Sequence, residues 1–211
     1  MTLSITIVLI IITAISSYYG INNAAFMERC MFIPYKIKRN GQWDRFITSG
    51  FIHKDYIHFF FNMFTFYFFG GVVEQVLAYK FGVVTGGAVY VIFYLLGIII
   101  SDIPTYLKNQ DNSYYRALGA SGGTAATVFA SIIILPLSDI CLFGILCLPG
   151  FILGVLFLLY SYFKGKNQDD AINHDAHLYG AIFGIVFILI IAPDSATTFV
   201  DQVVSYRPFK K

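Results

Sequence analysis

Six long apolar windows constrain this chain more than any other feature of its sequence. Each is close to the ~20 mostly apolar residues that a helix needs to cross the hydrocarbon core of a bilayer. Only 12% of the 211 residues are charged, against about 25% in an ordinary soluble domain. The sequence therefore predicts an all-α membrane protein with six transmembrane helices in a single domain, residues 1–211, surrounded by the lipid bilayer. The windows run from Leu3 to Tyr19, Tyr56 to Leu77, Val83 to Ser101, Ala117 to Leu137, Leu142 to Phe163 and Ala176 to Ala192.

Charge and cysteine content argue against several other classes of protein. The formal net charge is only +2, and the one short basic cluster, Arg207, Lys210 and Lys211, is too small for a nucleic-acid surface, so we expect no nucleic-acid partner. Cys30, Cys141 and Cys147 lack the spacing of a metal or redox motif. We predict that these cysteines are packing residues and that the protein has no metal and no cofactor.

Three connections between the windows are long and polar: Gly20 to Asp55, Asp102 to Arg116, and Lys164 to Asp175. With six crossings, all three lie on one side of the membrane. The second, fourth and sixth helices therefore enter the membrane from that side and run in the same direction.

Four polar residues lie near the start of these three helices: His58 and Asn62 on the second, Ser121 on the fourth and His177 on the sixth. At a rise of about 1.5 Å per residue, all four fall within roughly 10 Å of the same membrane surface. Polar groups at membrane depth are costly and are functional candidates by default. Each has an ordinary role when taken alone, as a packing serine, an interfacial histidine or an interhelical asparagine, and it is the shared depth that favours a common site.

The chemistry that these residues support is acyl transfer. A serine hydroxyl is a weak nucleophile unless an adjacent imidazole accepts its proton, and Ser121 and His177 can form that pair. His58 and Asn62 are spaced i, i+4 and share one face of a helix, from which they can donate to an oxyanion. Ser121 is also close to a helix N-terminus, where free backbone N–H groups favour negative charge.

Small residues on the fourth and sixth helices predict close packing between them. Gly180 and Gly184 form a Gly-x-x-x-Gly pattern on the sixth helix, and residues 122–126 of the fourth are Gly or Ala apart from Thr124. Such faces allow helix backbones to approach closely in membranes, with or without a catalytic role.

Three motifs together resemble those of rhomboid intramembrane proteases. Gly119-Ala120-Ser121-Gly122 looks like the Gly-x-Ser-Gly nucleophile motif, His58 to Asn62 resembles the His-x-x-x-Asn motif, and Ala176 to Gly180 is similar to the helix that carries the base. The first loop, with Trp43 and Arg45, is similar to the family's Trp-Arg loop. The likeness is strongest over residues 42–184.

The resemblance implies a six-helix rhomboid-like bundle with a long first loop, in the bacterial inner (plasma) membrane. It implies a serine endopeptidase that cuts the transmembrane segment of single-span membrane proteins near the outer face, after lateral opening of the fifth helix. Ser121 would be the nucleophile and His177 the base of a dyad without a carboxylate. His58, Asn62 and the Ser121 backbone N–H would form the oxyanion hole. Ala125 stands where family members often have an aromatic residue beside the base.

Charge distribution conflicts with the orientation that the resemblance implies. Ten of the 14 basic residues fall on the side of the long connections, and the positive-inside rule would place that side in the cytoplasm. The family's first loop faces outward and is a folded element rather than a simple loop. We predict the family orientation.

Other classes of protein fit the sequence less well. An inactive rhomboid-like protein that binds membrane segments without cutting them is the main alternative, although such relatives typically lose the serine or the histidine. Gly119 to Gly123 also fits the nucleophile elbow of α/β-hydrolases, but that elbow needs a preceding strand and here a polar loop precedes it. A zinc protease would need His-Glu-x-x-His, which is absent, and an aspartyl one would need paired membrane aspartates. A transporter is disfavoured because the sequence shows no inverted repeat.

Overall fold

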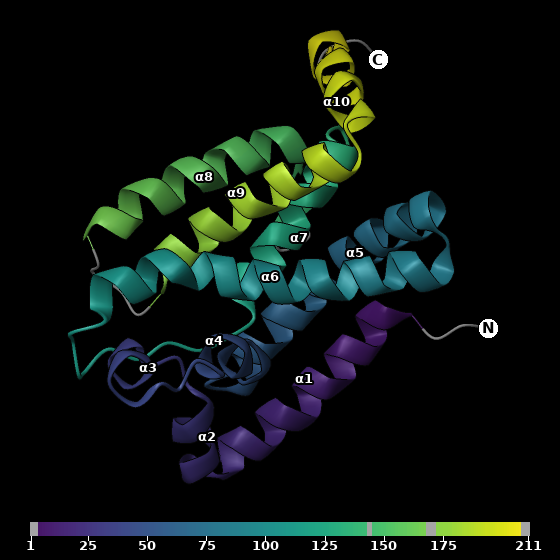
Figure 1. Cartoon of the computed structure of the whole chain (residues 1–211). Coiled ribbons are helices and arrows are strands. Elements are labelled where there is room, and N and C mark those ends of the chain that lie inside the picture. The colour runs from purple at the N-terminus through teal and green to yellow at the C-terminus, as the bar shows by residue number, and fades with distance from the viewer. Residues whose placement is uncertain (1–3, 143–144, 168–171, 208–211) are drawn as a thin grey trace.

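The computed structural model describes residues 4–142, 145–167 and 172–207, and within them the chain is mainly helical, as predicted (Figure 1). A 3-10 turn, Ser49–Phe51, follows α4, and a two-stranded antiparallel sheet separates α7 from α8. Leu3, residues 168–171 of the third predicted connection, and Lys210 and Lys211 lie outside the described residues. The elements are α1 (Ile5–Asn22), α2 (Ala24–Cys30), α3 (Pro34–Asn40), α4 (Arg45–Thr48), α5 (Tyr56–Phe81), α6 (Val83–Asn109), α7 (Ser121–Ile134), β1 (Asp139–Leu142), β2 (Leu146–Pro149), α8 (Gly150–Asn167), α9 (His174–Ile191) and α10 (Asp194–Ser205).

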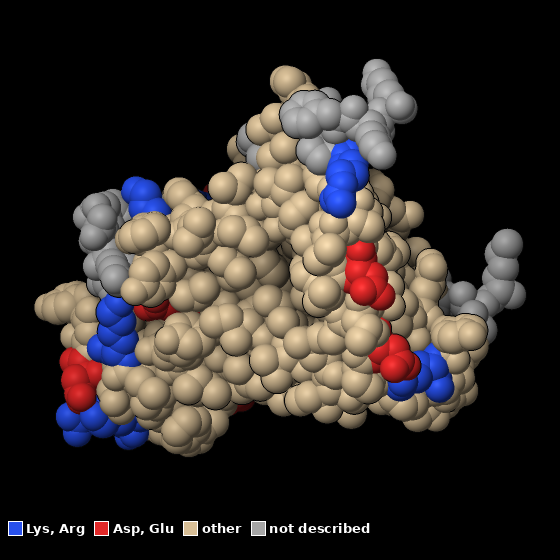
Figure 2. Space-filling view, turned by 90° about the horizontal axis from the view of Figure 1, so that it is seen from above, with Lys and Arg blue, Asp and Glu red and all other residues tan. Residues whose placement is uncertain are grey.

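Four of the described helices, α1, α5, α6 and α9, are long and apolar enough to cross a membrane. The helices α7 and α8 are apolar but shorter, and the 14 residues of α7 extend only about 21 Å. Six crossings thus remain a prediction that depends on α7 and α8. The view in Figure 2 shows charged side chains gathered toward the two ends of the molecule, with a broad uncharged surface between them. This pattern is that of an integral membrane protein.

The helices α5 and α7 run in the same direction, as the parity of the connections predicted. Near the start of α5 the His58 ring lies against Gly119, just before α7 begins. Eleven residues further along α5, the carbonyl of Phe69 accepts a hydrogen bond of 2.9 Å from Ser131 Oγ, near the end of α7. Contacts that advance together along both helices require parallel helices.

The predicted close packing of α7 and α9 is confirmed. A Cβ added at Gly180 would collide with the carbonyl of Gly122, and one added at Gly184 would collide with the carbonyl of Ala126. The two backbones therefore touch over a full turn, in parallel, with the first turns of both helices side by side. Only glycine at these two positions allows the approach.

The N-terminus of α1 is held by Glu74 of α5. This carboxylate accepts hydrogen bonds from Ser4 Oγ at 2.6 Å, from the backbone N–H groups of Ile5 at 2.7 Å and Thr6 at 3.0 Å, and from Thr6 Oγ1 at 2.7 Å. A carboxylate at this position satisfies free N–H groups of the first turn and complements the helix dipole.

The segment between α1 and α5 is folded around a buried arginine. Arg45 is 2% exposed and donates to the carbonyls of Glu28 and Met31 at 2.9 and 2.6 Å, and to Gln42 Oε1 at 2.7 Å. Because a buried guanidinium needs such partners, these bonds fix the path of the segment.

Two predicted boundaries of helices are wrong for local reasons. The connection expected from Asp102 to Arg116 is helical as far as Asn109, with Pro104 inside the helix, because a helix can continue beyond the apolar part that the hydropathy pattern detects. The helix expected from Ala117 begins at Ser121. Gly119 has a φ of +117°, which cannot continue a helix and which residues with a side chain rarely adopt.

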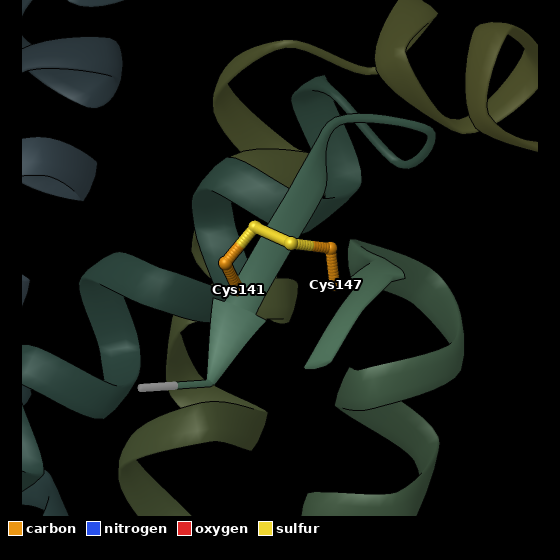
Figure 3. The surroundings of a disulfide bond; sticks show 2 residues. All are labelled: Cys141 and Cys147. Carbon is orange, nitrogen blue, oxygen red and sulfur yellow. A yellow bond between two sulfur atoms is a disulfide. The ribbon is translucent and has the colours of Figure 1, made fainter. Parts of the chain in front are cut away.

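The predicted start of the fifth helix and the role of two cysteines are also wrong. Instead of a helix from Leu142, a hairpin pairs Cys141 with Cys147 in register, and the two form a disulfide (Figure 3). Directly opposed residues on paired strands have neighbouring side chains, which brings the thiols together. Pro149 disfavours helical backbone in the residue before it, so α8 begins only at Gly150. Cys30 is a buried free cysteine, consistent with packing.

Candidate active site

Ser121 is the first residue of α7, and its N-cap residue, Ala120, makes no side-chain cap hydrogen bond. The backbone N–H groups of the first turn therefore point out of the helix end without a capping acceptor, which makes this end favourable for negative charge. The preceding turn is held by backbone atoms: Gly119 N donates to the carbonyl of Ser49 at 2.9 Å. The serine thus lies at a fixed turn beside an anion-favouring helix end.

Ser121 lines a small cavity of about 20 Å³. A cavity of roughly 10–15 Å³ or more can hold a water molecule if polar groups surround it. The polar groups around this cavity include Ser101 and Asp102 of α6 and Asn173 at the start of α9. His58, Asn62 and His177 are not among the lining residues. The lining is Ser49, Ile98, Ser101, Asp102, Ala117, Leu118, Gly119, Ser121, Gly122, Asn173 and Ala176.

His58 lies directly beside the turn that precedes Ser121. A Cβ added at Gly119 would lie 2.6 Å from His58 Cε1 and 2.9 Å from its Nε2, so this position needs glycine for space as well as for its φ. His58 Nδ1 is buried and has no hydrogen-bond partner among the described residues. The structure thus places the His58 ring beside the turn that precedes Ser121, while its role as an oxyanion donor stays a prediction.

A second histidine, His53, forms a hydrogen bond with the same turn. Its Nε2 accepts a hydrogen bond of 3.3 Å from the backbone N–H of Ala120, and its Nδ1 lies 2.9 Å from Ser17 Oγ. Because Nε2 accepts and Ser17 Oγ donates onward to the Phe51 carbonyl, the ring proton belongs on Nδ1. Burial, with a smaller contribution from His58, lowers the pKa of His53 to about 3, so the ring stays neutral at physiological pH.

Asn62 is buried, 8% exposed, one turn after His58. Its Nδ2 donates to the His58 carbonyl at 3.0 Å, which uses one of its two amide hydrogens and leaves the second for another acceptor. The side chain is thus tied to its own helix in the structure.

His177 lies in the first turn of α9, and its backbone N–H donates to the carbonyl of Asn173 at 3.3 Å. Its ring centroid is 6.0 Å from that of Phe157 on α8, with 31° between the planes. Phe157 is therefore an aromatic neighbour of the candidate base, whereas Ala125 stands at the position where an aromatic residue was expected and Tyr179 is 41% exposed.

Sequence reasoning missed the roles of His53, Phe157, Asp102 and Asn173. His53 contacts Ala120, Phe157 contacts His177 and Asp102 lies near Asn173, in each case at a distant position in the chain, and no spacing pattern marks such contacts. Within the part of the chain that the structure describes, no group of three or more His, Cys, Asp or Glu residues is placed to hold a metal ion.

The chain matches a known family. A family model described as Rhomboid domain matches residues 40–194, most of the chain, and this range includes Ser121, His177, His58 and Asn62. A comparison with curated proteins finds no match to this chain.

Proposed function

The chain belongs to the rhomboid family, and we propose that it is an intramembrane serine endopeptidase that cleaves transmembrane segments of single-span proteins near the outer membrane face. The observation that carries the proposal is the position of Ser121 at the uncapped N-terminus of α7, beside a polar cavity and next to the first turn of α9, which bears His177. We further propose a location in the bacterial inner membrane.

The proposed reaction proceeds through a covalent intermediate. Ser121 Oγ attacks the scissile carbonyl while His177 accepts the hydroxyl proton, and His177 then gives that proton to the leaving amine as the peptide bond breaks. A water molecule next loses a proton to His177 and attacks the acyl-enzyme. As the ester bond to Ser121 breaks, His177 returns that proton to Ser121 Oγ, which releases the second product and restores the serine. The cavity beside Ser121 is large enough for such a water.

The oxyanion of each tetrahedral intermediate needs donors fixed in advance. The backbone N–H of Ser121 at the start of α7, the His58 ring beside Gly119 and the second amide hydrogen of Asn62 are the proposed donors. Catalytic hydrogen bonds are often long or misaligned before substrate binds, so the bond of Asn62 to its own helix is compatible with this role.

Covalent labelling by a serine-directed fluorophosphonate tests the proposal. The purified protein is expected to be labelled, and both Ser121→Ala and His177→Ala are expected to abolish labelling and cleavage of a reporter membrane segment. Their losses should not add, because nucleophile and base act as a unit. Ser16→Ala is the matched control, since Ser16 Oγ only donates to the carbonyl of Ile12 in α1.

The same experiment distinguishes the protease from the second candidate function, that of an inactive rhomboid-like protein that binds membrane segments. Retention of both Ser121 and His177 favours the protease. A folded wild-type protein that is neither labelled nor able to cut any reporter, yet binds a membrane segment, would support the binding function instead. Turnover by a verified Ser121→Ala protein would overturn the assignment of the nucleophile.

A further inference from the structure

The N-terminus of α9 is fastened to α6 by side chains that are not among the proposed nucleophile, base and oxyanion donors. Asn173 is the N-cap of α9: its Oδ1 accepts hydrogen bonds from the backbone N–H of Ala176 at 3.1 Å and from Thr105 Oγ1 at 3.0 Å. Its Nδ2 lies 3.5 Å from Asp102 Oδ1, at the long end of the hydrogen-bond range. We call Asp102, Thr105 and Asn173 the α6–α9 clamp.

An ion pair extends the clamp along the same side of α6. Asp102, Thr105 and Lys108 are three residues apart and therefore lie along one side of the helix. Lys108 Nζ is 3.3 Å from Asp175 Oδ2, in the first turn of α9. This pair is partly exposed, so the buried part of the clamp, with Thr105 1% exposed, is the stronger restraint.

The clamp is linked directly to the base and is adjacent to the nucleophile. The backbone N–H of His177 donates to the carbonyl of Asn173, so the clamp residue and the base belong to the same helical turn. Asp102 and Asn173 also line the cavity that Ser121 lines. A movement of Asn173 would therefore displace His177 relative to Ser121.

The packing of α9 on α7 does not by itself supply this restraint. Gly180 and Gly184 press against the backbone of α7, which sets the distance between the two helices. Packing of small residues has little directional character, whereas hydrogen bonds fix both a distance and an angle. The clamp thus supplies directional bonds that restrain the axial position and rotation of the first turn of α9.

We propose that Asp102, Thr105 and Asn173 are positioning residues that set the place of His177 relative to Ser121. The proposal rests on the Ser121–His177 dyad of the proposed function. It assigns the three side chains no contact with substrate, and it makes their loss a defect in the rate of the chemical step rather than in substrate binding.

The first test compares Asn173→Ala and Thr105→Val with wild type in proteoliposomes, using a reporter membrane segment. Misplacement by about 1 Å can cost around 100-fold in rate, so we expect kcat to fall roughly 10- to 100-fold with KM unchanged. Asn23→Ala is the matched control, because Asn23 caps α2 in the same way, with its Oδ1 accepting from Phe26 N at 2.9 Å, far from α9. It should lose comparable thermal stability and keep its kcat.

The second test uses the pairing between Asp102 and Asn173. Asn173→Asp keeps an acceptor for Ala176 N but sets two carboxylates against each other, and it should lower kcat. Asp102→Asn keeps an oxygen that can accept from Asn173 and should have little effect alone. In the double variant Asp102→Asn/Asn173→Asp, the amide at position 102 can donate to the carboxylate at position 173, which should restore kcat to within about threefold of wild type. A threefold difference in kcat is smaller than the tenfold difference that corresponds to ~1.4 kcal/mol in activation free energy.

Hydrogen exchange of residues 174–178 gives a measurement independent of catalysis. Exchange should be faster in Asn173→Ala and Asn173→Asp, and should return toward wild type when Asp102→Asn is added. The clamp would be overturned if kcat were unchanged in Asn173→Ala, or if its loss of kcat were no greater than that of Asn23→Ala at equal stability. It would also be overturned if Asp102→Asn rescued neither kcat nor hydrogen exchange in Asn173→Asp, or only one of them. Failure of the proposed function is a separate result: wild type itself would then show no labelling that depends on Ser121, while the exchange data still decide whether the clamp exists.

Discussion

Replacing Gly119 by alanine tests whether the turn before Ser121 positions both the nucleophile and its oxyanion donor. The new Cβ would lie 2.6 Å from His58 Cε1 and 2.9 Å from Nε2, whereas carbon atoms in contact prefer about 3.5–4.0 Å. The His58 ring or the turn must therefore move by about 1 Å. In addition, the φ of +117° at this residue costs a residue with a side chain about 1–3 kcal/mol.

A displacement of this size predicts a loss of around 100-fold in kcat, about 2.7 kcal/mol in activation free energy. The assay is the rate of fluorophosphonate labelling together with kcat for a reporter membrane segment, normalised to folded protein. Gly71→Ala is the matched control, because a Cβ at Gly71 in α5 meets no atom within 4 Å, and alanine is the better helix former.

A double-variant cycle makes the test specific to His58. If Gly119→Ala acts by displacing the His58 ring, then His58→Ala should cost much less in the Gly119→Ala background than in wild type. Full additivity of the two losses, or a Gly119→Ala protein with kcat within threefold of wild type, would refute the reasoning from this contact.

Three further predictions concern other parts of the molecule. Asn62→Ala should lower kcat by about 10²–10³-fold, less than loss of the nucleophile, because other oxyanion donors remain; an effect on KM alone would make Asn62 a binding or packing residue. Glu74→Ala should destabilise the protein by roughly 1–3 kcal/mol in denaturant unfolding, because it leaves several donors at the start of α1 without their acceptor; kcat per folded molecule should not change. Tyr114 is 89% exposed and Tyr79 is 95% exposed, at opposite ends of the helices. In the family orientation, an impermeant thiol reagent should label Tyr114→Cys in intact cells and Tyr79→Cys only after lysis; the reverse result would show the opposite orientation.

Two features of the chain oppose the family orientation and make the labelling experiment decisive. Ten of the 14 basic residues fall on the side of the long connections, which the positive-inside rule assigns to the cytoplasm. The Cys141–Cys147 disulfide follows the C-terminal end of α7 and therefore lies at the other end of the bundle. Disulfides persist in oxidising compartments, whereas cytoplasmic thiols are kept reduced. In the family orientation, Cys141 and Cys147 are expected to be thiols in the cell.

Hydropathy alone located the six apolar helices, because membrane helices contain long apolar runs, but it misplaced several of their ends and missed α2, α3, α4 and α10. Ends depend on single backbone conditions, such as the φ of Gly119 or the restriction imposed by Pro149, and the α6 helix simply continues past its apolar part. The positions of the motifs predicted that His58 lies near Ser121, because both residues are close to the start of helices that run in the same direction and so lie at the same depth. Phe157 and Asn173 were missed because their importance comes from contacts across helices, which leave no periodic signal.

Directional bonds at the Ser121 end and apolar contacts along the helices hold this site in different ways. Along the first half of α7, small residues set how closely α9 approaches, with Gly180 and Gly184 of α9 against the backbone of Gly122 and Ala126, without fixing an angle. At the Ser121 end, the Ser49 carbonyl holds Gly119 N and the His53 ring holds Ala120 N. Both partners belong to the segment between α1 and α5, which is itself fixed by Arg45. A polar group without a partner at this depth is costly, so each bond both satisfies a buried group and restrains the turn. It follows that the turn before Ser121 depends on the folding of the first connecting segment as well as on the three helices that carry the motifs.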